Sequence, residues 1–369
     1  MTNPDSKILS PATFHGIPGW HDDDLDAALS AFRNSASEIL RKGAGFERPV
    51  RFGGERQDWV SLCERAQSIA DGRTFFESSF VPCLVADPLR PEGLFTGYYE
   101  PESDGSRQKS DIYSVPVLRT PEDFVAFDDA DQAATELKYG RKLDGTPQAY
   151  FTRREIEEGA LEGRGLEIVW LKDWADLFFM QIQGSGRVRL PDGNVVRLAF
   201  AAKSGHPYTA IGGILVERGL LSREDVSMQS IRIWMNQHPA AARELMWRNL
   251  SYVFFREIDG LDPALGPPGA QKVPLTPGRS LAVDRELWMF GTPVWVDTRR
   301  LENPHAESRP FRHLLIAQDT GSAIRGYARG DIFCGHGSEA AFIAGHLKSP
   351  GTMIVLLPNQ MAARILGAQ

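Results

Sequence analysis

Apolar positions near the start of the chain recur at helical spacing before a strand pattern replaces them. From His21 to Lys42 apolar residues lie mostly three or four positions apart behind an acidic first turn, which predicts an amphipathic helix. The stretch Asp58 to Ala70 predicts a second helix, and a third apolar segment runs from Phe75 to Leu84. None of these segments carries an obvious chemical group, so we interpret them as scaffold. The next stretch, Gly93 to Pro101, predicts a strand with two adjacent tyrosines.

The composition changes after Pro101 to polar, turn-forming residues, which marks a candidate domain boundary. The following region contains a short hairpin around the turn 191–194. It also contains helical patterns over 152–163, about 209–218, 223–237 and 239–247. The stretch 249–255 predicts a strand that returns the chain to the first domain.

Short apolar runs separated by proline and glycine fill the last part of the chain. They lie at 281–283, 293–296, 313–317, 331–333 and 353–357. This spacing predicts a small β-barrel rather than alternating βα units. The sequence has no GxGxxG or P-loop motif, so nucleotide chemistry has no support.

Length and charge narrow the class of protein. With 369 residues the chain is long enough for two or three domains, and its longest apolar runs fall short of a membrane span. The formal net charge of -7 argues against a general nucleic-acid binder. The first residues show no basic segment followed by an apolar stretch, so neither a secretory signal nor a lipid-attachment cysteine is visible.

Cysteine and histidine spacing gives no metal site. Cys63, Cys83 and Cys334 leave at least one thiol unpaired and lack the spacing of metal ligands, so we expect them to pack. His336 and His346 are ten residues apart and form no HExxH pattern. We therefore expect neither a metal nor another cofactor.

The segment Leu314–Gly335 carries the candidate chemistry. A buried-looking strand leads into a loop rich in glycine, with Asp319 near one end and Asp331 near the other. We expect the two carboxyl groups to face one another across a bend. Because two close carboxylates do not ionise easily together, one pKa would rise, as a general acid requires. An aspartate before glycine is also ordinary turn chemistry, and that alternative stays open.

Two other stretches carry groups that suit a sugar. Tyr98 and Tyr99 point to opposite faces of a strand, so only one of them can line a given surface, where its ring would stack on a pyranose. The stretch Met180–Gln183 alternates apolar and polar residues, which predicts a strand with both glutamine amides on one face before a Gly-Ser-Gly turn. Each pattern is equally compatible with a purely structural role.

Five separated motifs in the same order resemble the membrane-bound lytic murein transglycosylase A family over roughly residues 10–358. The resemblance implies an α+β fold, mainly β with helices, in which a double-psi β-barrel domain is interrupted by a second, mostly β domain, with a groove between them. The barrel domain would comprise 1–101 and 250–369, including a three-aspartate region at about 280–358, and the insert 102–249. The motifs are Phe95–Pro101, Gln181–Gly186, Tyr208–Gly212, Asn249–Phe255 and Asp319–Gly335.

The same resemblance implies non-hydrolytic cleavage of the β-1,4 bond between N-acetylmuramic acid and N-acetylglucosamine, giving 1,6-anhydromuramic ends (EC 4.2.2.-). Of the three aspartates Asp297, Asp319 and Asp331, it makes Asp331 the catalytic acid and Asp319 a supporting carboxylate. It places the protein on the periplasmic side of a Gram-negative envelope, possibly at the outer membrane, where partners in cell-wall enzyme complexes are unknown. The candidate substrate-binding residues are Tyr98, Tyr99, Glu100, Gln181, Gln183, Gly184, Ser185, Tyr208 and Ser251.

Two alternatives belong to other classes of protein. The sequence Asp319-Thr-Gly-Ser322 matches the active-site turn of aspartic proteases, which need two copies, and this chain has one Asp-Thr-Gly. A glycan-binding barrel of the expansin type, without catalysis, would keep the same aromatics and carboxylates. The soluble products formed from peptidoglycan would discriminate between these alternatives.

Overall fold

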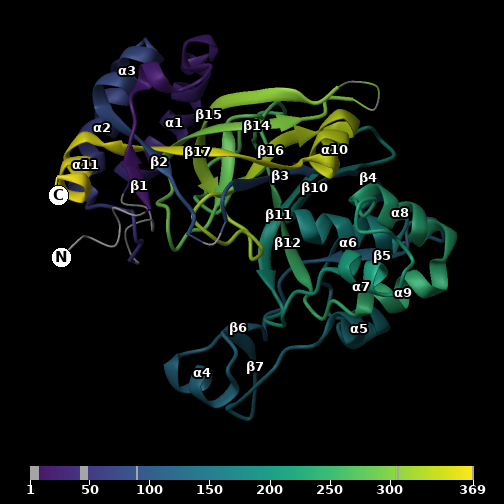
Figure 1. The fold of residues 1–369 in the computed structure, drawn as a ribbon. Helices are drawn as coiled ribbons and strands as arrows, with labels where there is room; N and C mark the ends of the chain where they lie inside the picture. The colour runs from purple at the N-terminus through teal and green to yellow at the C-terminus, as the bar shows by residue number, and fades with distance from the viewer. Residues whose placement is uncertain (1–7, 42–48, 89, 304, 306, 368–369) are drawn as a thin grey trace. The chain divides into compact units, whose positions relative to one another are not determined.

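The computed structural model describes residues 8–41, 49–88, 90–303, 305 and 307–367. The chain forms two compact units, of which unit 1 is Met1–Tyr99 with Leu261–Gln369 and unit 2 is Glu100–Gly260. Helices and strands occur in both units (Figure 1), which confirms the predicted α+β class. No helix within the described ranges is long and apolar enough to cross a membrane.

Six strands of unit 1 close into a barrel. Each strand is hydrogen-bonded to the next, and the last pairs with the first again, so the barrel has no open edge. The small β-barrel predicted from the apolar runs is therefore confirmed, whereas the double-psi arrangement stays a prediction. The barrel strands in order are β17 (Lys348–Pro358), β14 (Pro293–Arg300), β15 (Arg309–Asp319), β13 (Ser280–Val283), β16 (Arg329–His336) and β3 (Gly93–Glu100).

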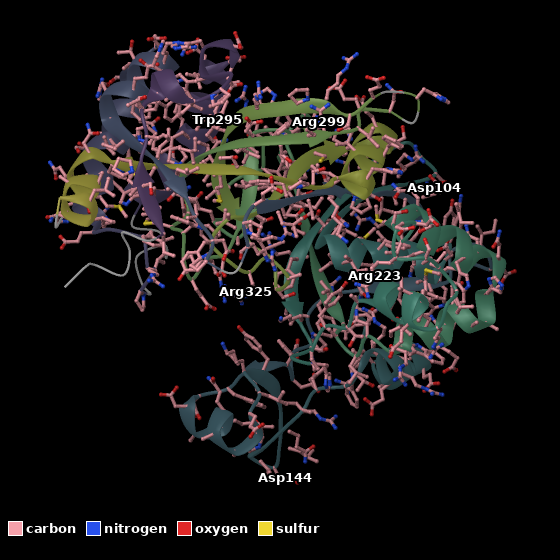
Figure 2. The ribbon with its side chains drawn as sticks, in the orientation of Figure 1. Asp104, Asp144, Arg223, Trp295, Arg299 and Arg325 are labelled. Atoms are coloured by element: carbon pink, nitrogen blue, oxygen red, sulfur yellow. The ribbon has the colours of Figure 1, made fainter. Side chains whose placement is uncertain are left out.

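The strands β13, β14, β15 and β17 contain continuous apolar runs because both of their faces are buried there. Successive side chains of a strand point to opposite faces. In β14, Val294 and Val296 pack in one apolar cluster with Leu315 of β15, while Trp295 (Figure 2) packs in another with Leu314. The second cluster contains helices on the outside of the sheet, so the strands face apolar side chains on both sides.

The helices predicted in the N-terminal region are confirmed as α1 (Leu25–Leu40) and α2 (Arg56–Ser68). Asp24 caps α1 through the amide of Ala27, and a capping box begins α2. The third apolar segment divides into the end of one helix and a strand that extends the barrel sheet. The remaining elements of unit 1 are α3 (Gly72–Ser79), β2 (Phe80–Val85), β1 (Leu9–Pro11), η2 (Phe14–Gly16), η3 (Trp20–Asp22), α10 (Gly337–His346) and α11 (Asn359–Leu366).

Unit 2 is built on a six-stranded sheet. Its central hairpin pairs β10 (Ser185–Arg189) with β11 (Val195–Lys203), as predicted from the turn between them. The strand β12 (Val253–Ile258) pairs with β11, so the chain stays in this sheet up to residue 258. The other strands of the sheet are β4 (Glu102–Ser106), β9 (Glu167–Leu171) and β5 (Val115–Leu118), and a separate small sheet contains β6 (Val125–Ala126), β7 (Tyr139–Leu143) and β8 (Thr146–Gln148).

Helices of unit 2 pack beside this sheet and form an apolar cluster of their own. The predicted helix over 152–163 is short and irregular, because a π-helical turn follows its first turn and Gly159 has a φ of 108°. The three later helical predictions are confirmed, the first two with shorter bounds and the third with the predicted bounds. The helices are α4 (Asp129–Thr135), α5 (Arg153–Glu155), the π-turn η5 (Ile156–Ala160), α6 (Trp174–Gln183), α7 (Ile211–Glu217), α8 (Met228–Gln237) and α9 (Pro239–Trp247).

Candidate active site

The two candidate acids flank one residue of the barrel. Ala282 in β13 pairs with Asp319 of β15 on one side and with Asp331 of β16 on the other. Residues in one row across a sheet point to the same face, so both carboxyl groups lie on the face of Ala282. The expectation that they face one another across a bend is wrong in its geometry: an intervening strand brings them together, because β15 and β16 both pair with β13.

Asp331 is partly exposed and accepts one recorded side-chain hydrogen bond. The hydroxyl of Thr96, on the neighbouring strand β3, donates to Asp331 Oδ1 over 2.5 Å. Burial raises the pKa of Asp331, while the charge of Arg329 and the bond from Thr96 act in the opposite direction. A carboxyl group with a raised pKa retains a proton to donate at higher pH than an exposed aspartate does.

Asp319 is held more firmly than Asp331. Its Oδ1 accepts from the amides of Ala270 and Thr320, each at 2.9 Å, and its Oδ2 accepts from the Tyr98 hydroxyl at 2.9 Å. Burial raises the pKa of Asp319, these hydrogen bonds lower it, and the charge of Asp331 raises it further. Asp319 is therefore an anchored acceptor.

The main cause of both raised pKa values is burial. Repulsion between the two carboxylates is a further cause, seen in the raised pKa of Asp319. The paired-carboxylate explanation is thus confirmed as a secondary cause that acts on the pair, behind burial. Unlike Asp331, Asp319 has oxygens that are both occupied by donors, which leaves Asp331 better placed to exchange a proton.

Tyr98 connects the acid pair to the strand with the two tyrosines. Its hydroxyl is used by Asp319, and its ring lies 5.3 Å from that of Phe333. Burial and the nearby Asp319 raise the pKa of Tyr98 well above its usual value, so the phenol stays protonated as a donor. Tyr99, the next residue of the strand, is partly exposed.

Of the other groups singled out in unit 1, Asp297, Cys63 and Cys83 do not join this site, whereas Cys334, whose pKa is raised by burial, lies close enough for the charge of Asp331 to raise it further. Asp297 pairs with Arg312 across β14 and β15, with Arg312 Nε 3.0 Å from Oδ1. Cys63 and Cys83 lie in the apolar clusters, as expected for packing residues, and Cys334 is partly buried. In the part of the chain that the structure describes, no group of three or more potential metal ligands is present.

The glutamines of unit 2 lie on a helix, so the predicted strand over Met180–Gln183 is wrong. Asp173 caps α6 by accepting from the amide of Asp176, and Gly184 ends the helix with a φ of 78°. The four-residue alternation was too short to distinguish a strand from the apolar helix that contains it. Residues two apart on a helix point in different directions, so Gln181 and Gln183 do not share a face.

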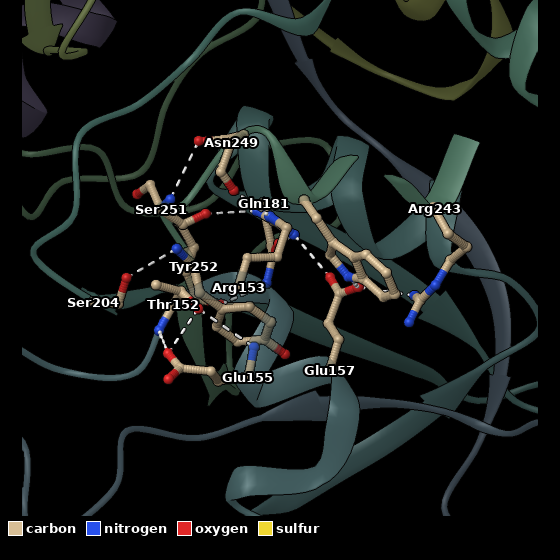
Figure 3. A network of polar contacts seen from close by, with 12 residues as sticks. Thr152, Arg153, Glu155, Glu157, Gln181, Ser204, Arg243, Asn249, Ser251 and Tyr252 are labelled. Carbon is tan, nitrogen blue, oxygen red and sulfur yellow. Dashed lines mark hydrogen bonds and ion pairs between the residues drawn. The ribbon is translucent and has the colours of Figure 1, made fainter. Parts of the chain in front are cut away.

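Gln181 and Ser251 meet at a buried arginine (Figure 3). Arg153 is 1% exposed; its Nη1 donates to Gln181 Oε1 over 2.5 Å and its Nη2 to the Ser251 carbonyl over 2.7 Å. Its Nε donates to the carbonyl of Asn249 over 3.0 Å. Arg153 therefore holds α6 and the stretch 249–251 in one geometry.

Asn249 extends this network toward Tyr208. The Asn249 side-chain oxygen accepts from the amides of Ser251 and Thr209, and Thr209 follows Tyr208. The Tyr208 side chain is 43% exposed, whereas Ser251 and Gln181 are buried. Of the three, Tyr208 is the side chain open to a ligand, and the other two support the surface around it.

Glu157 completes the buried network of unit 2. It forms ion pairs with Arg153 at 3.2 Å and Arg243 at 2.8 Å, and it accepts from Trp247 Nε1 at 2.9 Å (Figure 3). Its side chain is 2% exposed. These three contacts tie Glu157 to two arginines and a tryptophan, as in a structural carboxylate.

The remaining candidates of unit 2 differ in burial. Glu100 is fully buried between Arg187 at 2.7 Å and Arg197 at 2.9 Å. Ser185 is also buried at the start of β10, while Gln183 and Gly184 are partly exposed. Burial and ion pairing give Glu100 the contacts of a structural carboxylate, whereas its predicted contact with substrate stays a prediction.

Sequence reasoning missed the residues that orient these candidates. Thr96 and Arg329 lie inside the quoted motifs, but nothing in their spacing shows that they meet. Arg153 carries no local signal, since its partners Gln181, Asn249 and Ser251 are 28, 96 and 98 residues away.

Unit 1 is a closed barrel carrying an acid pair, and unit 2 is a large insertion between two barrel segments. Comparison with known proteins assigns both parts. Residues 94–256 match the MltA specific insert domain, and residues 279–357 match the 3D domain.

Solved and curated proteins agree with these matches. A membrane-bound lytic murein transglycosylase from Agrobacterium tumefaciens is 36% identical, with a TM-score of 0.87 over 97% of this chain and 99% of that one. Escherichia coli MltA, solved with bound chitohexaose, is 25% identical with a TM-score of 0.67 over 97% and 93% of the two chains. The chain belongs to the membrane-bound lytic murein transglycosylase A family, which confirms the resemblance.

The curated relatives are longer than the matched region. Membrane-bound lytic murein transglycosylase A of Vibrio cholerae is 33% identical over 263 residues, which are 70% of this chain and 63% of that protein. The match thus spans less than two thirds of that relative.

Proposed function

We propose that this protein is a peptidoglycan lytic transglycosylase. It cleaves the β-1,4 bond between N-acetylmuramic acid and N-acetylglucosamine without water and leaves 1,6-anhydromuramic ends. Family membership supports the substrate class, since the relatives are named for murein and one of them was solved with a chitin oligosaccharide. The observation that carries the mechanism is Asp331: a partly exposed carboxyl of raised pKa, held by one neutral donor beside an anchored second carboxylate.

Asp331 acts twice in one turnover. Its protonated carboxyl gives the proton to the glycosidic oxygen as the bond from that oxygen to C1 of muramic acid breaks through an oxocarbenium-like state. The C6 hydroxyl of the same sugar then bonds to C1, and the Asp331 carboxylate takes the hydroxyl proton. The acid is restored, no water is consumed, and no enzyme nucleophile is required.

An intramolecular hydroxyl favours ring closure over hydrolysis. A group tethered to the reacting sugar has a high effective concentration and competes well with solvent. We assign Asp319 a supporting role, since it fixes Tyr98 and the Ala270 amide beside the reacting carboxyl. The proposed glycan contacts outside the buried core are Tyr99, Tyr208, Gln183 at the end of α6 and Gly184 directly after it.

The remaining candidates lie behind the exposed residues and act indirectly. Gln181, Ser251, Ser185 and Glu100 are buried, so we propose that they shape the glycan-binding backbone. The substrate further implies that the protein works on the periplasmic side of the envelope. The predicted domain division, with the three-aspartate region in the barrel domain, is part of the same proposal.

Mass analysis of the soluble products tests this function. Purified protein is incubated with sacculi, and the released fragments are separated and weighed. New 1,6-anhydro ends are expected. Reducing ends would indicate a hydrolase, and binding without release would indicate a glycan-binding module; either result would contradict the proposal.

A further inference from the structure

A short chain of donors leads to one oxygen of Asp331. Arg329 and Asp331 are two residues apart on β16 and so point to the same face of the strand. Arg329 Nη2 donates to Thr96 Oγ1 over 2.8 Å, and Thr96 Oγ1 in turn donates to Asp331 Oδ1 over 2.5 Å. Three side chains from two neighbouring strands thus form a directed path that ends on Oδ1.

The chemistry of arginine sets the direction of this path. A guanidinium has donors and no acceptor, so Thr96 Oγ1 must accept from it. The hydroxyl has one hydrogen, and among the described residues the contact recorded for that hydrogen is Asp331 Oδ1. A hydroxyl that accepts from a cation is also a stronger donor and a weaker acceptor, because hydrogen bonds in a chain polarise one another.

We propose that Arg329 and Thr96 are positioning residues that keep Asp331 Oδ1 an acceptor and place the transferable proton of Asp331 on Oδ2. The inference rests on the proposed function and adds to it which oxygen reacts. The proton leaves from Oδ2 toward the glycosidic oxygen, and the proton of the C6 hydroxyl returns to Oδ2. The protons of Thr96 and Arg329 stay where they are, so the same oxygen serves in both steps.

The path also stabilises the carboxylate between the two steps. Both the Thr96 hydrogen bond and the Arg329 charge lower the pKa of Asp331 against the effect of burial. The other titratable groups recorded as interacting with Asp331 are Asp319, Tyr98 and Cys334, and the Asp331 charge raises the pKa of each. The cation that offsets burial at Asp331 is therefore Arg329, which acts both through its charge and through Thr96.

Thr96→Val tests this path of donors without changing the size of the side chain. Valine suits a strand and lacks the hydroxyl, so the carboxylate of Asp331 loses its donor and its pKa rises. The alkaline limb of kcat/KM on soluble peptidoglycan strands reports the acid of the free enzyme. We expect this limb to move up by about one pH unit, since a bond to a charged group corresponds to about that shift.

Turnover of this variant should fall about twofold, because either carboxyl oxygen is then free to hold the proton and about half of the molecules carry it on Oδ2. Thr96→Ser keeps the hydroxyl and should restore the wild-type limb. If Thr96→Val does not fold, Thr96→Ala removes the same hydroxyl and should show the same upward movement.

Thr298→Val is the matched control. Thr298 is another barrel threonine, more buried than Thr96, and its hydroxyl donates to the Pro350 carbonyl over 2.7 Å rather than to an acid. Its alkaline limb should match that of the wild type. If the alkaline limb of Thr96→Val lies at the same pH as that of Thr298→Val, or at lower pH, the proposed positioning role of Thr96 and Arg329 is wrong. A wild-type protein that forms no anhydro ends would instead overturn the proposed function, so the two failures are distinguishable.

Discussion

The carboxylates Glu100 and Glu157 of unit 2 are each enclosed by two arginines, whereas the recorded hydrogen bonds to Asp319 and Asp331 of unit 1 come from neutral donors. The two arginines around each glutamate compensate its negative charge. The neutral donors around each aspartate leave burial as the main influence, so the pKa of each aspartate rises. Carboxylates in the two units thus have different surroundings, which agrees with a structural role for the two glutamates and with the proposed chemical role for the two aspartates.

The largest expected effect is on turnover at the barrel acid. Asp331→Asn removes the transferable proton and should lower the release of anhydro fragments from sacculi by about a thousandfold or more. Asp297→Asn, at the aspartate that pairs with Arg312, should stay within about threefold of the wild type. Near-normal turnover in Asp331→Asn would show that this carboxyl is not the acid.

The next effect is on stability in unit 2. Glu157→Gln leaves the buried Arg153 and the partly buried Arg243 without their counter-ion and should lower the free energy of unfolding by about 3 kcal/mol, measured by denaturant titration. The neighbouring Glu158 pairs with Arg154 on the surface, so Glu158→Gln should cost less than about 0.5 kcal/mol. Equal losses in the two variants would mean that the enclosed pair is not structural.

The supporting carboxylate should give a smaller loss of activity. Asp319→Asn weakens the bonds from Tyr98 and the Ala270 amide and should lower kcat/KM about tenfold. The charges of Asp319 and Asp331 repel one another, so removing the Asp319 charge should also move the alkaline limb of the pH profile to lower pH. A limb that stays in place would show instead that Asp319 does not tune the acid by repulsion.

The smallest effect concerns the free energy of unfolding when Asp331 is replaced. It should have the opposite sign to the effect of Glu157→Gln in unit 2. The folded-state pKa of Asp331 is raised, so its contribution to stability is fully present below the unfolded pKa and is lost as pH rises through the folded pKa. Asp331→Asn avoids this loss and should raise the free energy of unfolding near pH 7 by roughly 1 kcal/mol. The gain should vanish in acid, and a lower stability at neutral pH would contradict the comparison.

The barrel was predictable from sequence because strands that are buried on both faces appear as continuous apolar runs, here separated by prolines and glycines. The helices α1 and α2 were predictable from their single buried stripe. By contrast, α6 is apolar on most of its surface, so the four residues Met180–Gln183 matched a strand by chance. A short stretch of sequence identifies a helix reliably only where buried residues recur along it at the helical spacing.

The sequence pointed to candidate residues for the site but not to its geometry. Asp319 and Asp331 stood out by their place near glycines. Their separation, however, is set by β13, which lies between them in the sheet but well before both of them in the sequence. The contacts of Arg153 and Thr96 depend on chain segments that meet only after folding. Their side chains follow ordinary local patterns, so no signal in sequence could have indicated their partners.

The most direct test of the account is the fate of water oxygen during cleavage. Sacculi are digested by the purified protein in water labelled with oxygen-18, and the new muramic ends are weighed, with Asp331→Asn as the control without turnover. The account predicts anhydro ends that carry no label, because the C6 hydroxyl of the sugar closes the ring and Asp331 takes back its proton. Labelled reducing ends would contradict it.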